Sequence, residues 1–369
     1  MSTYKILTIN PGSTSTKIAV FEDTKEIISK NISHDAKELA KYQEVSDQLP
    51  YRKEMILQFL EENKIDYSKM DAIVGRGGGL LAVEGGVYEL NDLLLAHAKV
   101  GANGISHPAQ LGPILANAFA EIAGCPAFAV NPPDTDELQP LARITGVKGI
   151  YRNVHLHALN LKETAIVHAK KMGKRYEDCN FIVCHIGGGI SISAHKKGRM
   201  VDGNDIVGGE GPMAPTRCGA LPAMELIKYC FSGVTEKEAR ALCTKTGGFV
   251  SHLQTSDARD VRARMQEGDK AAKTIWEALL YQITKEIGAM SAVLEGKVDG
   301  ILLGGGMVHS EELVNKITQV CSYIAPVTAY PGEFEMEAMA SGALRALKGE
   351  EKTKEYTGAP VWNPADYGL

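Results

Sequence analysis

Residues 6–20 combine a short apolar run with small, polar and hydroxyl side chains at a fixed spacing. The apolar residues 6–9 end at Asn10, and a Pro-Gly pair then makes a tight turn. Gly12 lets the backbone approach a ligand, and successive N–H groups with short hydroxyls around such a turn form an anion cradle. This hypothesis assigns phosphate contacts to Asn10, Gly12, Ser13, Ser15 and Lys17. An ordinary hairpin at the start of a sheet is the alternative.

A second stretch, residues 182–194, repeats this order in the other half of the chain. Its apolar run ends at His185, a glycine follows two residues later, and an alternating apolar and hydroxyl strand comes next. A third glycine turn follows the apolar residues 300–303. The glycines of these two turns are Gly187, Gly188 and Gly189, and Gly304, Gly305 and Gly306. The repetition favours duplicated domains that close on one phosphate-rich ligand.

The segments around these turns alternate between short apolar runs and longer periodic ones, which predicts an α/β protein. Strands are predicted at 6–9, 18–21, 71–74, 127–130, 181–194, 199–202 and 300–303. Helices are predicted within 35–63, 91–123, 155–173, 222–231, 269–295, 311–321 and 335–348. The repeat predicts a first domain over 1–150 and a second over 151–334, with 335–369 packing back on the first.

Composition bounds the class of protein. A chain of 369 residues with 44% hydrophobic and 23% charged residues is long enough for two domains with cores of their own. The net charge of -5 gives no electrostatic reason to expect nucleic acid or an anionic membrane surface as a partner. No apolar run approaches the roughly 18 residues of a membrane span. Scattered cysteines without a C-x-x-C pair, and no signal peptide, indicate a cytoplasmic protein.

Two common nucleotide motifs are absent. A dinucleotide site needs G-x-G-x-x-G between a strand and a helix, and a Walker loop needs G-x-x-x-x-G-K-[ST]. Here the glycines stand between one strand and the next. A hairpin type of phosphate site therefore remains.

These motifs occur together with Pro215–Gly219 and Ser256–Asp260. In this order, and along essentially the whole chain, they resemble the butyrate-kinase group of the acetokinase family. The resemblance implies two duplicated ribonuclease-H-like domains of the actin-like ATPase type with a central nucleotide cleft. It also implies acyl and phosphate binding by residues 1–150, nucleotide binding by 151–334, and a homodimer or higher homo-oligomer.

The reaction implied by the resemblance is butanoate + ATP = butanoyl phosphate + ADP, by direct in-line transfer. A short fatty acid has a carboxylate pKa of roughly 4.3 and is ionised at pH 7, so no general base is needed. The site must instead supply positive charge, because an anion approaches a polyanion. Arg76 and Arg217 are the candidates, since each is flanked by small residues and guanidinium groups bind such oxygens bidentately.

Histidines complete the catalytic set that the resemblance implies. His155 matches the family's active-site histidine, which hydrogen-bonds the transferring phosphoryl group, and His157 is a nearby alternative. On a helix the two would face different ways, so only one should point into the cleft. His185 is expected to donate to phosphate oxygens.

The resemblance also implies metal and adenosine sites. Mg²⁺ prefers oxygen ligands and is assigned to Asn10, Asp134 and Glu335, with Glu333 as the alternative glutamate. Helix N-terminal carboxylates that stabilise the dipole are the competing interpretation. Asp257 and Arg259 are expected to line the adenosine pocket, with the glycines 304–306 under the base. Asp257 can equally serve as an N-cap.

The walls of the acyl pocket are, by the same resemblance, Gly78, Ser106, His107 and Val154. The matching positions in acetate kinases are bulkier. Smaller walls leave room for more methylene groups, each worth roughly 0.8 kcal/mol when buried. A four-carbon acid such as butanoate or isobutanoate is therefore predicted.

Three other functions stay open at this point. An acetate or propionate kinase would use the same site with a smaller pocket. A non-transferring actin-like ATPase would bind the nucleotide but has no use for Arg76, Arg217 and His155. A sugar kinase needs a general-base aspartate, a part that Asp134 could play.

Overall fold

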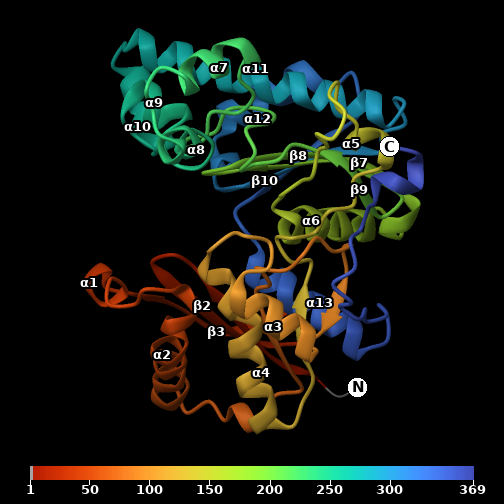
Figure 1. The fold of residues 1–369 in the computed structure, drawn as a ribbon. Helices are drawn as coiled ribbons and strands as arrows, with labels where there is room; N and C mark the ends of the chain where they lie inside the picture. Colours follow the sequence, from red (N-terminus) through yellow and green to blue (C-terminus); the bar gives the residue numbers. More distant parts are fainter. Residues whose placement is uncertain (1–2) are drawn as a thin grey trace. The chain divides into compact units, whose positions relative to one another are not determined.

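The computed structural model describes residues 3–369, which form two compact units (Figure 1). The first contains the chain up to Asp136 and the segment Phe334–Gly368, and the second contains Glu137–Glu333. The repeat in the sequence placed the first boundary at residue 150. In the structure residues 137–150 already belong to the second unit.

Two contacts explain why the chain joins the second unit so early. The Gln139 N–H donates to the carbonyl of Val201 (2.9 Å). Glu137 is 4% exposed and its carboxylate lies 2.8 Å from Lys162 Nζ. A buried carboxylate needs such a partner, so Glu137 fixes the start of this unit.

The first unit is built on a sheet with the strand order β3-β2-β1-β4-β6-β5. Its strands are β1 (Lys5–Pro11), β2 (Ser15–Glu22), β3 (Lys25–Ser33), β4 (Ala72–Gly75), β5 (Val87–Glu89) and β6 (Ala127–Val130). Its helices are α1 (Ala36–Leu39), α2 (Leu49–Glu62), α3 (Asp92–Val100), α4 (Leu111–Ala123) and α13 (Glu335–Leu347). β1 is antiparallel to β2 and parallel to β4.

Both faces of this sheet are covered. Leu7 and Ile9 of β1 pack in one hydrophobic cluster with residues of α2 and α4. α13 packs against β1, β4 and β6. A Cβ at Gly342 of α13 would clash with Val130, so glycine allows the close approach of this helix to the sheet.

The second unit is built on a sheet with the order β11-β10-β7-β8-β9. Its strands are β7 (Asn180–Ile186), β8 (Ile190–Lys196), β9 (Arg199–Gly203), β10 (Gly300–Gly305) and β11 (Val327–Pro331). Its helices are α5 (Pro140–Arg143), α6 (Ala158–Lys171), α7 (Ala223–Cys230), α8 (Glu236–Thr244), α9 (Gly248–Leu253), α10 (Ala258–Gln266), α11 (Lys270–Val293) and α12 (Glu311–Cys321).

Alternation along β7 sets the layers of the second unit. Ile182 and Cys184 pack in the cluster that contains the apolar side of α11, whereas Phe181 and Val183 pack in the cluster that contains α6. Successive side chains of a strand point to opposite faces, so one strand serves both layers. Figure 1 shows α11 and α6 on the two sides of this sheet.

The two sheets repeat one topology. β3-β2-β1-β4-β6 in the first unit corresponds to β9-β8-β7-β10-β11 in the second. In each, an antiparallel hairpin is joined to two further strands that run parallel to its first strand. The duplicated α/β architecture predicted from the two glycine turns is confirmed.

Several elements differ from their sequence predictions. β3, β5, β11 and the helices α8, α9 and α10 were not predicted, and β3 is an edge strand with mostly exposed side chains, which hides its pattern. The helix predicted over 155–173 begins at Ala158, so His155 and His157 precede it. The strand predicted over 300–303 continues to Gly305. Among the helices of residues 3–369, none is long and apolar enough to cross a membrane.

Truncation of Leu279 should destabilise the second unit. Leu279 lies on α11 with no exposed surface, in the hydrophobic cluster that also contains Ile182 and Cys184 of β7. We expect Leu279→Ala to lower the free energy of unfolding by about 2–5 kcal/mol, because it leaves a cavity. Tyr281→Ala is the control, since Tyr281 is 67% exposed on the same helix. Urea unfolding followed by the fluorescence of the two tryptophans measures both, and equal losses would contradict this packing.

Candidate active site

The turn between β1 and β2 presents free backbone donors. Gly12 N–H donates to the carbonyl of Ser15 (2.7 Å), and the His34 N–H donates to that of Thr14 (2.8 Å). The N–H groups of Ser13 and Thr14 have no acceptor among residues 3–369. A Cβ at Gly12 would lie 3.5 Å from the Ser15 oxygen, an ordinary contact, so the fold itself does not demand glycine there. Ser15 and Lys17 are partly buried on β2, and Lys17 pairs with Asn10.

Three predicted residues of the first unit meet beside this turn. Arg76 follows β4, is 9% exposed, and its Nη1 lies 3.1 Å from Glu335 Oε1. Asn10 Nδ2 donates to the other Glu335 oxygen (2.6 Å). The alternative glutamate, Glu333, lies in the second unit, with Oε1 3.8 Å from His185 Nε2. Asn10, Arg76 and Glu335 thus form one charged cluster.

His107 lies beside the same turn as a neutral donor. Its Nδ1 accepts from the Ala109 N–H (3.1 Å), so the neutral ring carries its proton on Nε2, which is 3.5 Å from Ser13 Oγ. Burial, together with the charges of Arg76 and Arg52, lowers the pKa of His107. The neutral ring therefore dominates at pH 7, and its Nε2–H faces Ser13 in the turn between β1 and β2.

The other predicted residues of the first unit have varied settings. Asp134 is 4% exposed and accepts from Asn103 Nδ2 (2.6 Å). Gly78 is buried, and a Cβ there would lie 3.1 Å from Ala109 Cβ, so its small size is set by packing. Ser106 is exposed.

The turn between β7 and β8 holds two stacked histidines. The rings of His185 and His157 are 4.0 Å apart at 20°. Ser191 fixes His157, because its Oγ lies 2.8 Å from His157 Nδ1. Gly187 N–H donates to the carbonyl of Gly189 (3.1 Å), which closes the turn, and Gly188 at its tip is exposed. His157 thus supports His185.

Arg217 lies against this second turn. A Cβ at Gly189 would clash with the Arg217 guanidinium, so glycine makes room for that group. Arg217 Nε and Nη1 are buried without a hydrogen-bond acceptor in residues 3–369. Burial lowers the pKa of Arg217, and the charge of Asp205 opposes this effect. Unsatisfied guanidinium donors favour an anionic ligand.

Asp205 lies beside His155 and acts on Arg217 through its charge, and the sequence analysis missed it. The Asp205 carboxylate lies 3.4 Å from His155 Nδ1 and accepts from the Val207 N–H (3.0 Å). The aspartate is 7% exposed. No motif surrounds it in the sequence, since it reaches the site from the loop after β9. Val154, a predicted wall of the acyl pocket, is 3% exposed in the core with α6.

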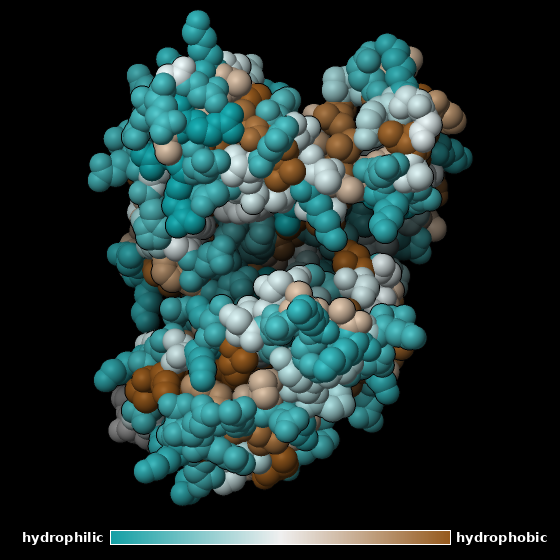
Figure 2. All heavy atoms as spheres, turned by 90° about the vertical axis from the view of Figure 1, so that its left-hand side faces the viewer, coloured by the Kyte–Doolittle hydropathy of each residue, from teal (hydrophilic) through white to brown (hydrophobic). Residues whose placement is uncertain are grey.

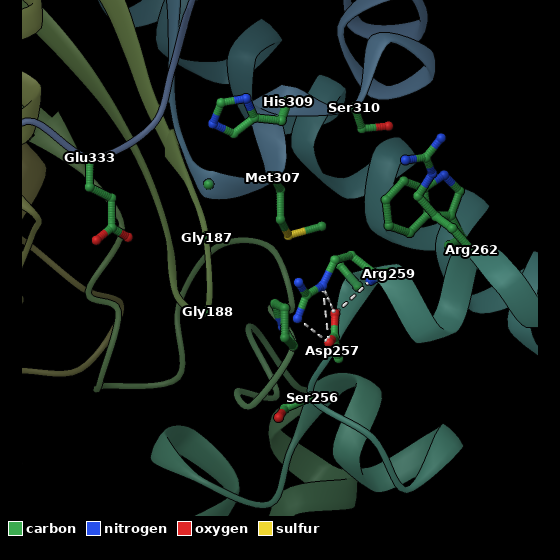
Figure 3. A pocket seen from close by; sticks show the side chains of 14 residues that line it. Gly187, Gly188, Ser256, Asp257, Arg259, Arg262, Met307, His309, Ser310 and Glu333 are labelled. Atoms are coloured by element: carbon green, nitrogen blue, oxygen red, sulfur yellow. Dashed lines mark hydrogen bonds and ion pairs between the residues drawn. The ribbon is translucent and has the colours of Figure 1, made fainter. Parts of the chain in front are cut away.

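A cavity of about 740 Å³ lies next to Gly187 and Gly188 (Figure 3). Asp257 and Arg259 line it from the start of α10. Arg259 Nη2 lies 2.7 Å from Asp257 Oδ2, and this ion pair lowers the pKa of Asp257 to about 2. Asp257 also accepts from the Arg259 N–H (2.8 Å) as the N-cap of α10. The N-cap interpretation is therefore correct, and the same side chain lines the cavity.

The third glycine turn is shorter than predicted. Gly304 and Gly305 end β10, and Gly306 opens a 3-10 turn that lines the cavity. Gly305 has φ +98° and a Cβ there would clash with the backbone of Ile186, so its role is structural. Met307 and His309 come directly after it and were missed, although their position after the turn was a signal. Figure 3 shows both side chains at the cavity.

Comparison with known proteins identifies the family of this chain. A sequence profile of the Acetokinase family matches residues 146–324. Two proteins from Clostridium botulinum, each named probable butyrate kinase, are 48% identical over 96% of this chain and 99% of their own. Butyrate kinase 2 from Clostridium acetobutylicum is 45% identical over the same shares.

Solved structures with low sequence identity share the fold. The acetate kinase of Porphyromonas gingivalis has a TM-score of 0.75 at 18% identity, over 94% of this chain and 100% of its own. A propionate kinase from Francisella tularensis has a TM-score of 0.71 at 19% identity, over 92% and 98%.

The duplicated sheets and their parallel and antiparallel strand order have the fold that these acetate and propionate kinase structures share. The predicted fold class is confirmed by the matching structures. The chain belongs to the Acetokinase family. It is an enzyme, a kinase that uses ATP.

A methyl group at Gly189 should damage catalysis more than folding. The atoms it would meet are the end of the Arg217 side chain, which can move aside at little cost in stability. We expect Gly189→Ala to lower kcat on the order of 100-fold, because displaced catalytic groups lose that much. Gly288→Ala adds a methyl in open space on α11 and should leave kcat unchanged. Steady-state kinetics with thermal melts measures both, and a normal kcat for Gly189→Ala would refute the role of Arg217.

Proposed function

We propose that the enzyme phosphorylates butanoate, or a near four-carbon neighbour, with the γ-phosphoryl group of ATP. The observation that carries the proposal is the 48% identity to probable butyrate kinases over nearly the full length of both chains. The site chemistry supports it, because Arg76 and Arg217 supply buried positive charge and no side chain needs to act as a base.

The charges divide into two tasks. Arg217 has two buried donors without partners, which suits the equatorial oxygens of a transferring phosphoryl group. Arg76 presents a guanidinium held by Glu335, which suits a carboxylate or phosphoryl oxygen. The acid attacks as a carboxylate, the bond from its oxygen to phosphorus forms, and the bond to the bridging oxygen of ADP breaks. No proton moves in this step.

Neutral and positioned histidines assist the transfer. His107 donates from Nε2 beside the first turn, and its lowered pKa keeps that donor neutral. His155 is oriented by Asp205 at Nδ1, so its Nε2 is directed away from that carboxylate. His185, stacked on His157, donates to phosphate oxygens at the second turn.

Mg²⁺ fits the donor set of the first unit. Asn10 uses Nδ2 toward Glu335 and keeps Oδ1 as an oxygen donor, and Glu335 and Asp134 add carboxylates. No cluster of three His, Cys, Asp or Glu suited to a metal occurs among residues 3–369, but Mg²⁺ needs only one or two carboxylates beside phosphate and water. When bound, the cation neutralises phosphate charge.

The cavity beside the second turn is proposed to hold adenosine. Asp257 and Arg259 provide polar groups at one wall, and Met307 and Gly306 provide apolar contact for a base (Figure 3). This division is usual for nucleotide pockets, where a few polar groups fix orientation. Gly305 allows the close approach of β10 to Ile186 of β7, whereas a Cβ at Gly304 would make only ordinary contacts.

We also propose a cytoplasmic homo-oligomer. All seven cysteines lie in the described range and are free thiols, as in a reducing compartment. Met224 and Ile227 on α7 are 66% and 50% exposed, and Phe231 after it is 88% exposed. A second copy would cover such apolar surface. Figure 2 shows apolar groups among hydrophilic ones on the face of the second unit.

Hydroxylamine trapping tests the reaction directly. With ATP and Mg²⁺, we expect hydroxamate to form fastest with butanoate or isobutanoate, then propanoate and acetate. Each extra methylene group that the pocket buries is worth roughly 0.8 kcal/mol and should raise kcat/KM about fourfold. If hydroxamate formed fastest with acetate, the proposed reaction would stand, but the preference for a four-carbon acid would be refuted. ATP consumption without hydroxamate would support an ATPase, and phosphorylation of a sugar would support a sugar kinase.

The assignment of the metal glutamate is tested by a matched pair. We expect Glu335→Gln to raise the Mg²⁺ concentration for half-maximal rate on the order of tenfold, because a carboxylate beside Asn10 is lost. Glu333→Gln, which lies near His185 instead, should shift it less. Titration of the rate with free Mg²⁺ measures both. The opposite order would assign the metal to Glu333.

A further inference from the structure

A buried arginine with no role so far lies behind the first turn. Arg52 comes from α2 and has no exposed surface. Its Nη1 donates to the Ser15 carbonyl (3.1 Å) and to Thr16 Oγ1 (2.9 Å). Its Nη2 donates to the Gly12 carbonyl (3.0 Å), and Nε and Nη2 both donate to Gln48 Oε1 (3.0 and 2.9 Å). The guanidinium thus donates hydrogen bonds to both ends of the turn, at Gly12 and at Ser15.

Every acceptor of this guanidinium is neutral. Within residues 3–369, Arg52 forms no ion pair, although fully buried charges are rarely left unpaired. Burial lowers its pKa to about 10, so the group remains charged at neutral pH. The fold therefore keeps a positive charge next to the phosphate turn without any carboxylate to cancel it.

The surrounding network also stays neutral. Thr16 Oγ1 accepts from Arg52 and so donates to His34 Nε2 (2.8 Å), and His34 Nδ1 then faces the Tyr51 hydroxyl (3.2 Å). Burial and the charge of Arg52 lower the pKa of His34 to about 4. At pH 7 His34 therefore adds no second positive charge, and Thr16 carries no negative charge that would offset Arg52.

The hydrogen bonds from Arg52 to two carbonyls orient the turn and so set the direction of its unpaired N–H groups. The Gly12 and Ser15 carbonyls point to Arg52, while the N–H groups of Ser13 and Thr14 remain without partners in residues 3–369. A turn held from behind by three hydrogen bonds keeps its anion cradle in one conformation before a ligand arrives. Such preorganisation improves binding because less ordering is needed.

We propose that Arg52 is a positioning residue for the phosphoryl donor, which fixes the first turn and adds a buried positive charge behind it. The proposal rests on the proposed function only in that the ligand is a nucleoside triphosphate. Arg52 does not contact the phosphates, since the backbone of the turn stands between them. Its effect should therefore concern ATP far more than the acid.

The test compares Arg52→Met, which keeps the stem and removes the charge, with Arg52→Lys, which keeps the charge and loses the fork. Calorimetric titration with ATP and Mg²⁺, without acid, should show Kd raised on the order of tenfold or more for Arg52→Met and less for Arg52→Lys. The KM for butanoate should stay within about twofold. Added guanidinium should restore part of the ATP affinity of Arg52→Met.

The matched control is Arg345→Met on α13, where the arginine pairs with Glu351 instead of a turn. It should leave the Kd for ATP unchanged. A folded Arg52→Met with normal Kd for ATP would overturn the proposal, as would equal losses for ATP and butanoate. If Arg52→Met does not fold, Arg52→Lys decides, because lysine cannot hold both carbonyls and a normal Kd would then refute the clamp. Failure to form acyl phosphate by the unmodified enzyme would instead refute the proposed function.

Discussion

Both units depend on one arrangement of hydrogen bonds, in which a central strand pairs antiparallel with its hairpin partner and parallel with a later strand. Because parallel strands end at the same edge of a sheet, this arrangement brings distant parts of the chain together. Asn10 is the last residue but one of β1, and Arg76 directly follows the parallel β4. In the second unit the same rule places His185, the last residue but one of β7, beside Gly304 of β10.

Desolvated positive charge is a common property of the candidate residues in both units. Arg76 is nearly buried with one carboxylate, Arg217 has buried donors without acceptors, and Arg52 has only neutral acceptors. Each arrangement is costly in the free protein, because charge leaves water without full compensation. The cost falls when a polyanion binds. The same side chains thus lower the stability of the free protein and raise its affinity for a polyanion. The hydrophobic core around α11 offsets that loss of stability.

Much of the fold was readable in the sequence, because long amphipathic helices and glycine turns carry strong local signals. α11 was predicted from its apolar face, and the duplication from two turns. β3 and β11 were not, since their side chains are largely exposed or half-buried and the pattern of a buried strand is missing. The site was readable where glycines flank an arginine. Asp205 and Arg52 stand in ordinary polar stretches, and only the fold brings them to the turns. The roles of all site residues remain predictions.

The path of the chain has a consequence for synthesis. The second unit is continuous, whereas the sheet of the first unit receives α13 from residues made after the whole of the second. On the ribosome the second unit can complete its core while the first still lacks one covering layer, and domains do fold as they emerge. Glu335, the carboxylate that holds Arg76 and Asn10, arrives with that last helix. A nascent chain therefore cannot assemble the charged cluster until translation is nearly finished, however early its other two members are made.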